Sequence, residues 1–244
     1  MITSKSNDFI KFCLQIKDKK YSREYSKCLV ESIKLVRELS QKGLVETILV
    51  VESKFDSVKE FNCKKIEKIS LVIADLLAET ITTDGVFAVC KIPESSVSDY
   101  SRCLILDRIQ DPSNLGAILR SACAFGFRTI LAINSVYPYT GKVIRSSMGQ
   151  IFNVNYCELT YENLLKVKEQ QNMHFVVADM DGIDVSKFDK SSANRLGLVI
   201  GNEGAGVSKE LCNAADNVIS IPMTDGVESL NASVSAGILM YILK

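Results

Sequence analysis

The chain has 244 residues, of which 47% are hydrophobic and 24% are charged, a balance typical of a soluble protein with a buried core. Its 29 basic and 29 acidic residues cancel, so the total charge does not indicate a nucleic-acid partner. The apolar stretches are too short for a membrane helix, and lysine and aspartate interrupt the N-terminal segment, which excludes a signal peptide. We therefore expect a cytoplasmic protein with no membrane partner.

The cysteines and the single histidine restrict the possible chemistry. Eight cysteines are spread singly with no CxxC pair, a pattern that favours reduced, mostly buried thiols and predicts no metal site. One histidine, His174, excludes a two-histidine mechanism. We interpret it as structural, since no residues near it form a triad.

Residues 1–93 are expected to form a small α/β unit. A helical pattern covers residues 5–42 and ends at Gly43, and patterns of strand, helix and strand follow. Residues 1–42 contain ten basic and five acidic residues, a local charge of +5. On charge alone this favours a solvated helix face over a surface that contacts phosphates.

Residues 94–102 are the best linker candidate, and from residue 103 to residue 244 the pattern becomes regular. Short apolar strands alternate there with helices, which predicts an α/β fold with a parallel sheet covered on both faces. The expected strands are 103–107, 129–134, 151–156, 174–180, 196–201 and 217–222, and the expected helices are 114–126, 141–150, 161–171, 206–215 and 229–243.

A glycine cluster, GNEGAG, follows the apolar run that ends near Ile200. Its order, Gly201, Gly204, Gly206, differs from the G-x-G-x-x-G of dinucleotide-binding folds, and only 38 residues follow it. The lysine and hydroxyl spacing of a phosphate-binding P-loop is also absent. The cluster therefore disfavours a phosphate loop and is compatible with a backbone-lined loop for an uncharged ring and ribose.

Two other stretches combine helix starts with polar side chains. After the first predicted strand of the sheet, Asn114 can cap a helix that carries Gly116 and Arg120, close to where ligands bind in parallel sheets. Near the chain end, Ser229 and Asn231 open the last helix, whose first turns are rich in small residues. Each stretch is also compatible with an ordinary capped helix and a surface arginine.

Together these stretches resemble the SpoU (TrmH-like) RNA ribose 2′-O-methyltransferases of the SPOUT superfamily. The similarity rests on three motifs in the family's order: N-x-G-x-x-x-R at 114–120, G-x-E-x-x-G at 201–206, and I-P-M at 221–223 followed by S-L-N-x-S at 229–233. The resemblance implies a C-terminal trefoil knot, S-adenosylmethionine as cofactor and a homodimer formed by the C-terminal domain.

The first unit resembles the family's RNA substrate-binding domain, although Glu31-Ser32 stands where many relatives have Glu-Gly. This resemblance favours RNA contact by the basic front end. The candidate RNA-binding residues are Lys19, Lys20 and Arg23, with Arg145, which is equally compatible with a surface charge.

The family's roles transfer to the matching positions. The implied catalytic residues are Arg120, Asn114, Glu203, Ser229 and Asn231, and the implied cofactor-binding residues are Gly201, Asn202, Gly204, Ile221, Met223 and Leu230, beside a loop at 178–182. Arg120 would either act as a base or, as we prefer, bind a phosphate and stabilise the developing alkoxide. Asn114 would orient Arg120 or the ribose, and Glu203 would orient the glycine loop or pair with Arg120.

The expected substrate is structured RNA, ribosomal RNA before transfer RNA. Three alternatives remain at this point: a non-catalytic RNA-binding protein on the same fold, a SPOUT enzyme that methylates a base nitrogen, and a nicotinamide dehydrogenase. The three intact motifs argue against the first, the N-x-G-x-x-x-R motif against the second, and the glycine order against the third.

Overall fold

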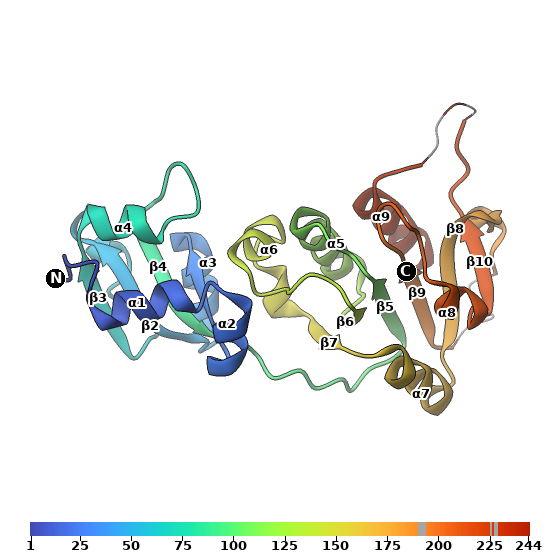
Figure 1. Cartoon of the computed structure of the whole chain (residues 1–244), viewed down its shortest axis with the longest axis horizontal. Helices are drawn as coiled ribbons and strands as arrows, with labels where there is room; N and C mark the ends of the chain where they lie inside the picture. The colour runs from blue at the N-terminus through green and yellow to red at the C-terminus, as the bar shows by residue number, and fades with distance from the viewer. Residues whose placement is uncertain (190–193, 225, 227–228) are drawn as a thin grey trace. The chain divides into compact units, whose positions relative to one another are not determined.

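The computed structural model describes residues 1–189, 194–224, 226 and 229–244. The chain forms two compact units, one of residues 1–94 with 139–149 and one of residues 95–138 with 150–244 (Figure 1). The segment Tyr139–Gly149, which the sequence places within the C-terminal domain, thus groups with the first unit. It contains α6 (Gly141–Ser146), which contacts β1, and Gly149 approaches Leu35 closely.

The first unit is built on a four-stranded sheet with the order β1-β4-β2-β3. Strand β4 is antiparallel to both of its neighbours, and β2 is parallel to β3. The strands are β1 (Lys27–Glu31), β2 (Val45–Val51), β3 (Lys65–Ile69) and β4 (Val86–Lys91), and the helices are α1 (Asp8–Gln15), α2 (Lys19–Tyr25), α3 (Ile33–Gln41), α4 (Leu71–Leu77) and the 3₁₀ helix η1 (Glu52–Ser57). Buried side chains of α1, α4 and the sheet form one core.

The prediction of helix throughout residues 5–42 is wrong at its centre. Helix α2 ends at Ser26, which has a left-handed φ of 50°, and β1 follows at once. Cys28, Leu29 and Val30 are buried and pair with β4, a long-range interaction that a local periodicity does not reveal.

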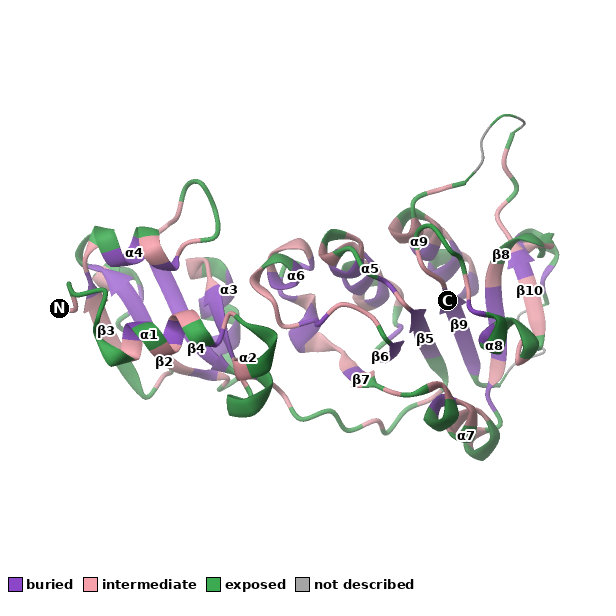
Figure 2. Cartoon of the chain, in the orientation of Figure 1, coloured by how far each residue is buried: buried purple, intermediate pink, exposed green. Residues whose placement is uncertain are grey.

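The second unit contains a six-stranded sheet with the order β10-β8-β9-β5-β6-β7, and every neighbouring pair is parallel. This confirms the predicted α/β fold. The strands are β5 (Arg102–Asp107), β6 (Thr129–Ile133), β7 (Asn155–Glu158), β8 (His174–Asp184), β9 (Leu196–Ile200) and β10 (Asn217–Ser220). Strands β5, β6 and β9 are almost wholly buried (Figure 2), as continuous apolar runs in a parallel sheet should be.

Helices cover this sheet. Helices α5 and α9 pack against each other, and the α7 and α8 side chains Leu164 and Leu211 join a core with Ile105, Phe175 and Val199. The helices are α5 (Pro112–Phe125), α7 (Tyr161–Gln171), α8 (Lys209–Asn213) and α9 (Ala232–Leu243), with the 3₁₀ turns η2 (Gln150–Asn153) and η3 (Val185–Lys187).

Two helix starts differ in their agreement with the sequence. Asn231 caps α9 as expected, since its Oδ1 accepts the Ser233 N–H. Asn114 does not cap α5: the helix begins at Pro112, and the Asp111 carboxylate accepts the N–H groups of Ser113 and Asn114. Proline suits the first helical position because its missing N–H would have no partner there, so the Asn114 side chain is available for other contacts.

The strand order places β9 between β5 and β8, where the chain changes direction across the sheet. Ligands of open parallel sheets bind at the carboxyl ends of the strands near such a point. Among the described residues no helix is long and apolar enough to cross a membrane.

Candidate functional site

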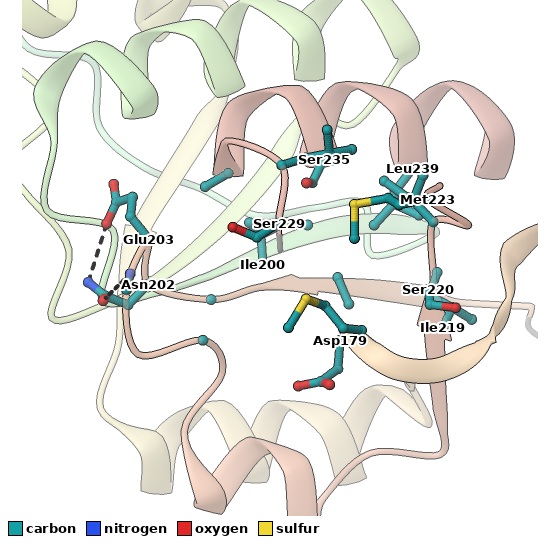
Figure 3. Close-up of a pocket in the computed structure, with 18 residues that line it drawn as sticks. Asp179, Ile200, Asn202, Glu203, Ile219, Ser220, Met223, Ser229, Ser235 and Leu239 are labelled. Carbon is teal, nitrogen blue, oxygen red and sulfur yellow. Dashed lines mark hydrogen bonds between the residues drawn. The ribbon is translucent and has the colours of Figure 1, made fainter. Parts of the chain in front are cut away.

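A pocket of about 360 Å³ lies within the second unit, at the carboxyl ends of β8, β9 and β10 (Figure 3). Three loops and one side of α9 form its walls. The lining residues are Ala178, Asp179, Met180, Ile200, Gly201, Asn202, Glu203, Gly204, Gly206, Ile219, Ser220, Ile221, Met223, Ser229, Leu230, Ala232, Ser235 and Leu239.

One wall exists because β8 is irregular. Its pairing with β10 passes from Val177 opposite Val218 directly to Ile183 opposite Ile219, so residues 178–182 leave the ladder. Gly182 lies so close to Ile219 that an added Cβ would be 2.5 Å from the Ile219 carbonyl carbon. The bulge turns Ala178, Asp179 and Met180 into the pocket.

A second wall is the glycine loop, residues 201–206, which folds back on itself after β9. Asn202 and Gly206 exchange two backbone hydrogen bonds of 3.0 Å each, and the Asn202 Oδ1 accepts the Gly204 and Ala205 N–H groups. A Cβ on Gly201 would collide with the Gly206 carbonyl group. The turn therefore requires glycine at 201, whereas a Cβ on Gly204 would have its nearest neighbour 3.8 Å away.

The Glu203 carboxylate holds this loop against the loop after β5. It accepts the Asp111 N–H at 3.2 Å, the Gln110 N–H at 3.4 Å and the Asn114 Nδ2 at 3.0 Å. Desolvation alone would raise the pKa of Glu203, but the hydrogen bonds from Asn114 and the backbone outweigh it and lower that pKa. The carboxylate is thus kept ionised as an acceptor.

The hydrogen bonds continue to α9. Asn114 donates to Glu203 and accepts at its Oδ1 from the Asn231 Nδ2, 3.0 Å away. Asn231 in turn caps α9. A continuous chain from Glu203 through Asn114 to Asn231 therefore connects one residue from each of the three sequence motifs.

Arg120 lies on α5, two turns beyond Asn114, and its side chain is exposed. Within the part of the chain that the structure describes, it makes no hydrogen bond or ion pair, so the suggested pairing with Glu203 and the orientation by Asn114 are absent here. Its guanidinium is consequently available to a ligand or substrate.

All six residues proposed for cofactor binding line the pocket, together with Ser229 and Glu203. Lys19, Lys20 and Arg23 are exposed on α2, which belongs to the first unit, whereas the pocket residues belong to the second. Arg145, in α6, forms an ion pair of 2.5 Å with Glu79 inside the first unit. This contact favours the interpretation of Arg145 as a surface charge over that of an RNA contact. His174 also has a structural contact, 2.6 Å from the Asn217 Oδ1.

Sequence reasoning missed several pocket residues, among them Ser220, Ser235 and Leu239. Asp179 lies in the 178–182 loop that the family resemblance implied as a neighbour of the cofactor, and the glycine in the run ADMDG was the available signal for its bulge. No motif distinguishes Ser235 or Leu239 from other residues of α9, because only the packing turns them toward the pocket.

The parallel sheet, the glycine-lined pocket, the amide–carboxylate chain and the exposed arginine are compatible with the RNA methyltransferase class that the three motifs predicted. Residues 101–241 match the profile of the SpoU rRNA Methylase family. The match covers more than half of the chain, and the chain belongs to this family; the predictions of the family and of a methyltransferase are confirmed.

Individual relatives match over the whole length. The chain is 29% identical over 249 residues to the 23S rRNA (guanosine(2553)-2′-O)-methyltransferase RlmP of Bacillus subtilis, covering 100% of this chain and 98% of that protein. It is similar to the structure of an RNA 2′-O ribose methyltransferase, with a TM-score of 0.83, 25% identity and coverage of 99% and 97%. An AdoMet-bound rRNA methyltransferase from Sinorhizobium meliloti shares the fold, with a TM-score of 0.89, 22% identity and coverage of 99% and 96%.

The lowered pKa of Glu203 generates a pH prediction. Because the folded pKa lies below the ordinary value of 4.5, the carboxylate contributes stability that is present above pH 4.5 and is lost as the pH falls through the folded pKa. Glu203→Gln should therefore unfold at lower urea concentration than the wild type at about pH 6, and the difference should shrink at about pH 3.5. A difference that stays constant over this range would contradict the role of the ionised carboxylate.

Proposed function

We propose that the protein transfers a methyl group from S-adenosylmethionine to a ribose 2′-hydroxyl of ribosomal RNA. The observation that carries the proposal is the pocket formed by residues 178–180, 201–206 and 219–223, together with the exposed Arg120. The full-length similarity to RlmP and the family membership support the same reaction.

The pocket residues fit this cofactor. Its volume lies in the range of small-molecule sites. Ile200, Ile219 and Leu239 offer apolar surface to an adenine ring, while the backbone of the glycine loop can approach the ligand closely. Asp179 and Ser220 offer polar groups for hydroxyls or an ammonium. The similar rRNA methyltransferase from Sinorhizobium meliloti is AdoMet-bound, in agreement with this assignment.

The cofactor's sulfonium supplies an electrophilic methyl group, so the protein has to position the ribose hydroxyl and accept developing negative charge. We assign charge stabilisation to Arg120, whose positively charged guanidinium offers five N–H donors. It would bind the phosphate beside the target ribose and stabilise the 2′-alkoxide, with phosphate or water accepting the proton.

The remaining catalytic candidates hold the site in place. Glu203 fixes the glycine loop to the loop after β5, and Asn114 links it to Asn231. These hydrogen bonds hold the three motifs at fixed positions relative to one another, and they would thereby fix the distance between the cofactor and the substrate. Ser229 lines the pocket beside Leu230 and is a candidate for contact with the target nucleotide.

The first unit is proposed to bind the structured part of the RNA. Lys19, Lys20 and Arg23 are exposed on α2, and an exposed cationic surface of this kind can contact phosphates. The similarity to RlmP favours ribosomal RNA. Transfer RNA is the second candidate, because a 38% identical relative from Staphylococcus epidermidis, matched over 58% of this chain, is named a TrmH family tRNA/rRNA methyltransferase. An RNA substrate also favours a cytoplasmic location.

A homodimer through the second unit is the assembly that we propose. Val234 and Tyr241 are seven residues apart on α9, share one face, and are 48% and 57% exposed. Tyr241 packs on Phe125 of α5, with ring centroids 5.6 Å apart, which extends the apolar surface. A trefoil knot in the C-terminal segment, implied by the family resemblance, belongs to the same proposal.

Arg120→Ala should lower the rate of methyl transfer to ribosomal RNA by about 10²–10³-fold while the Kd for S-adenosylmethionine stays within about twofold. Transfer of labelled methyl and calorimetry measure the two quantities. Arg102→Ala is the matched control, since Arg102 is also exposed but lies at the amino end of β5. Undiminished activity of Arg120→Ala, or equal losses of activity in both variants, would contradict the assignment of charge stabilisation to Arg120.

Gly201→Ala should weaken cofactor binding by at least about tenfold, because its Cβ would collide with the backbone of Gly206 and displace the loop. Gly204→Ala should weaken binding less than Gly201→Ala does, because Gly204 also lines the pocket but its Cβ would be 3.8 Å from the nearest protein atom and would leave the loop in place. Calorimetric titration of both variants with S-adenosylmethionine measures the two Kd values. Equal affinities for the two variants would count against the glycine loop as a cofactor wall.

Val234→Glu should convert the dimer into monomers, because it places a charge in the proposed apolar interface. Val72→Glu is the control: Val72 is 55% exposed on α4 of the first unit, and its replacement should leave the dimer intact. Light scattering after size-exclusion chromatography measures the mass. A monomeric wild type, or dimeric Val234→Glu, would argue against this interface.

A further inference from the structure

A buried carboxylate outside the pocket is the strongest feature that the proposed reaction does not use. Asp107, the last residue of β5, is 0% exposed. An ionised carboxylate is costly to bury unless several donors satisfy it, so its partners identify what it does. We call Asp107, Arg108, Tyr161 and Ser208 the Asp107 cluster; none of the four lines the pocket.

The donors to Asp107 come from three segments. The Tyr161 hydroxyl donates at 2.7 Å, the Ser208 N–H donates at 2.6 Å, and the Arg108 Nε donates at 3.3 Å. Tyr161 is the first residue of α7 and Ser208 precedes α8. Partial burial raises the pKa of Tyr161 and the hydrogen bond to Asp107 adds to this, so the phenol remains a proton donor at neutral pH.

The Asp107 cluster is hydrogen-bonded to both ends of the glycine loop. Ser208 lies two residues after Gly206, and its N–H is fixed by the buried carboxylate. The Arg108 guanidinium donates to the Gly206 carbonyl at 3.2 Å, and the Arg108 carbonyl accepts from the Asn202 Nδ2 at 2.8 Å. Arg108 itself has a left-handed φ of 59°, and both its side chain and its carbonyl bond to the loop.

We infer that the Asp107 cluster is a positioning device for the glycine loop, in which the Tyr161 hydroxyl sets the affinity for the cofactor without touching it. The Asp107 cluster holds Ser208 and Gly206, and Glu203 holds the middle of the loop. Loss of the phenol would leave the buried carboxylate one donor short and loosen its hold on Ser208. The inference rests on the proposed function only in taking the pocket as the cofactor site.

Tyr161→Phe tests this with minimal change of shape, and Tyr100→Phe is the matched control. Both tyrosines are half-buried and pack against the same core, but the Tyr100 hydroxyl makes no hydrogen bond among the described residues. A merely structural role would lower the stability of Tyr161→Phe but would leave the cofactor affinity and the exchange of the glycine loop as in Tyr100→Phe.

In the ligand-free protein, Tyr161→Phe should increase amide hydrogen exchange in peptides covering residues 201–208, while Tyr100→Phe should not. The Kd for S-adenosylmethionine should rise by about tenfold, the effect of one lost hydrogen bond to a charged group. The KM for S-adenosylmethionine should rise similarly, and kcat at saturating cofactor should stay within about twofold. Unchanged exchange and affinity, or equal changes in both variants, would overturn the inference.

Arg108→Asn supplies a second route if Tyr161→Phe does not fold. Asparagine tolerates the left-handed conformation at this partly exposed position, but its shorter side chain would not reach the Gly206 carbonyl. The same local rise in exchange and loss of affinity is expected, and their absence would overturn the inference. Failure of the wild type to bind S-adenosylmethionine would instead contradict the proposed function, since the exchange measurement does not depend on the cofactor.

Discussion

The Glu203 carboxylate joins two loops separated by 89–93 residues in the sequence. It receives two backbone N–H groups from the loop after β5 and an amide from α5, and a carboxylate with several such donors stays ionised and well oriented. The glycine loop can form a pocket wall because this acceptor fixes its middle while β9 fixes its beginning. Asn114 extends the same hydrogen-bond chain to Asn231 and thus to α9.

The parallel sheet explains why these loops meet. Strand β9 lies between β5 and β8, so the carboxyl ends of three neighbouring strands deliver the 107–114, 178–182 and 201–208 segments to one edge. Rigid buried strands support irregular loops, and the close approaches at Gly182 and Gly201 allow backbone to pass where a side chain would collide. In this arrangement catalysis depends on holding two substrates in place, which suits a reaction whose electrophile the cofactor supplies.

The sequence predicts the alternating strands and helices of the second unit well, because the pattern of apolar residues that produces each element lies within a short stretch of sequence. It predicts five of the six parallel strands of the second unit and the last helix with its Asn231 cap. The strand expected at 151–156 is misplaced, because residues 150–153 form η2 and β7 covers 155–158. The six proposed cofactor residues that line the pocket are implied by the family motifs. The prediction from sequence fails where a residue far away in the chain determines the local structure. Strand β1 forms inside a helical pattern because it pairs with β4, and Asn114 bonds Glu203 and Asn231 because Asp111 takes the capping role. The burial of Asp107 and the ion pair of Arg145 with Glu79 likewise depend on contacts across the fold.

The identity of the methylated atom tests the central claim most directly. Ribosomal RNA would be incubated with the protein and methyl-labelled S-adenosylmethionine, digested to nucleosides and analysed by mass spectrometry, with Arg120→Ala as the blank. The proposed reaction predicts that the label lies on a ribose 2′-oxygen. Label on a base nitrogen, or no label in RNA although the protein binds the cofactor, would contradict it.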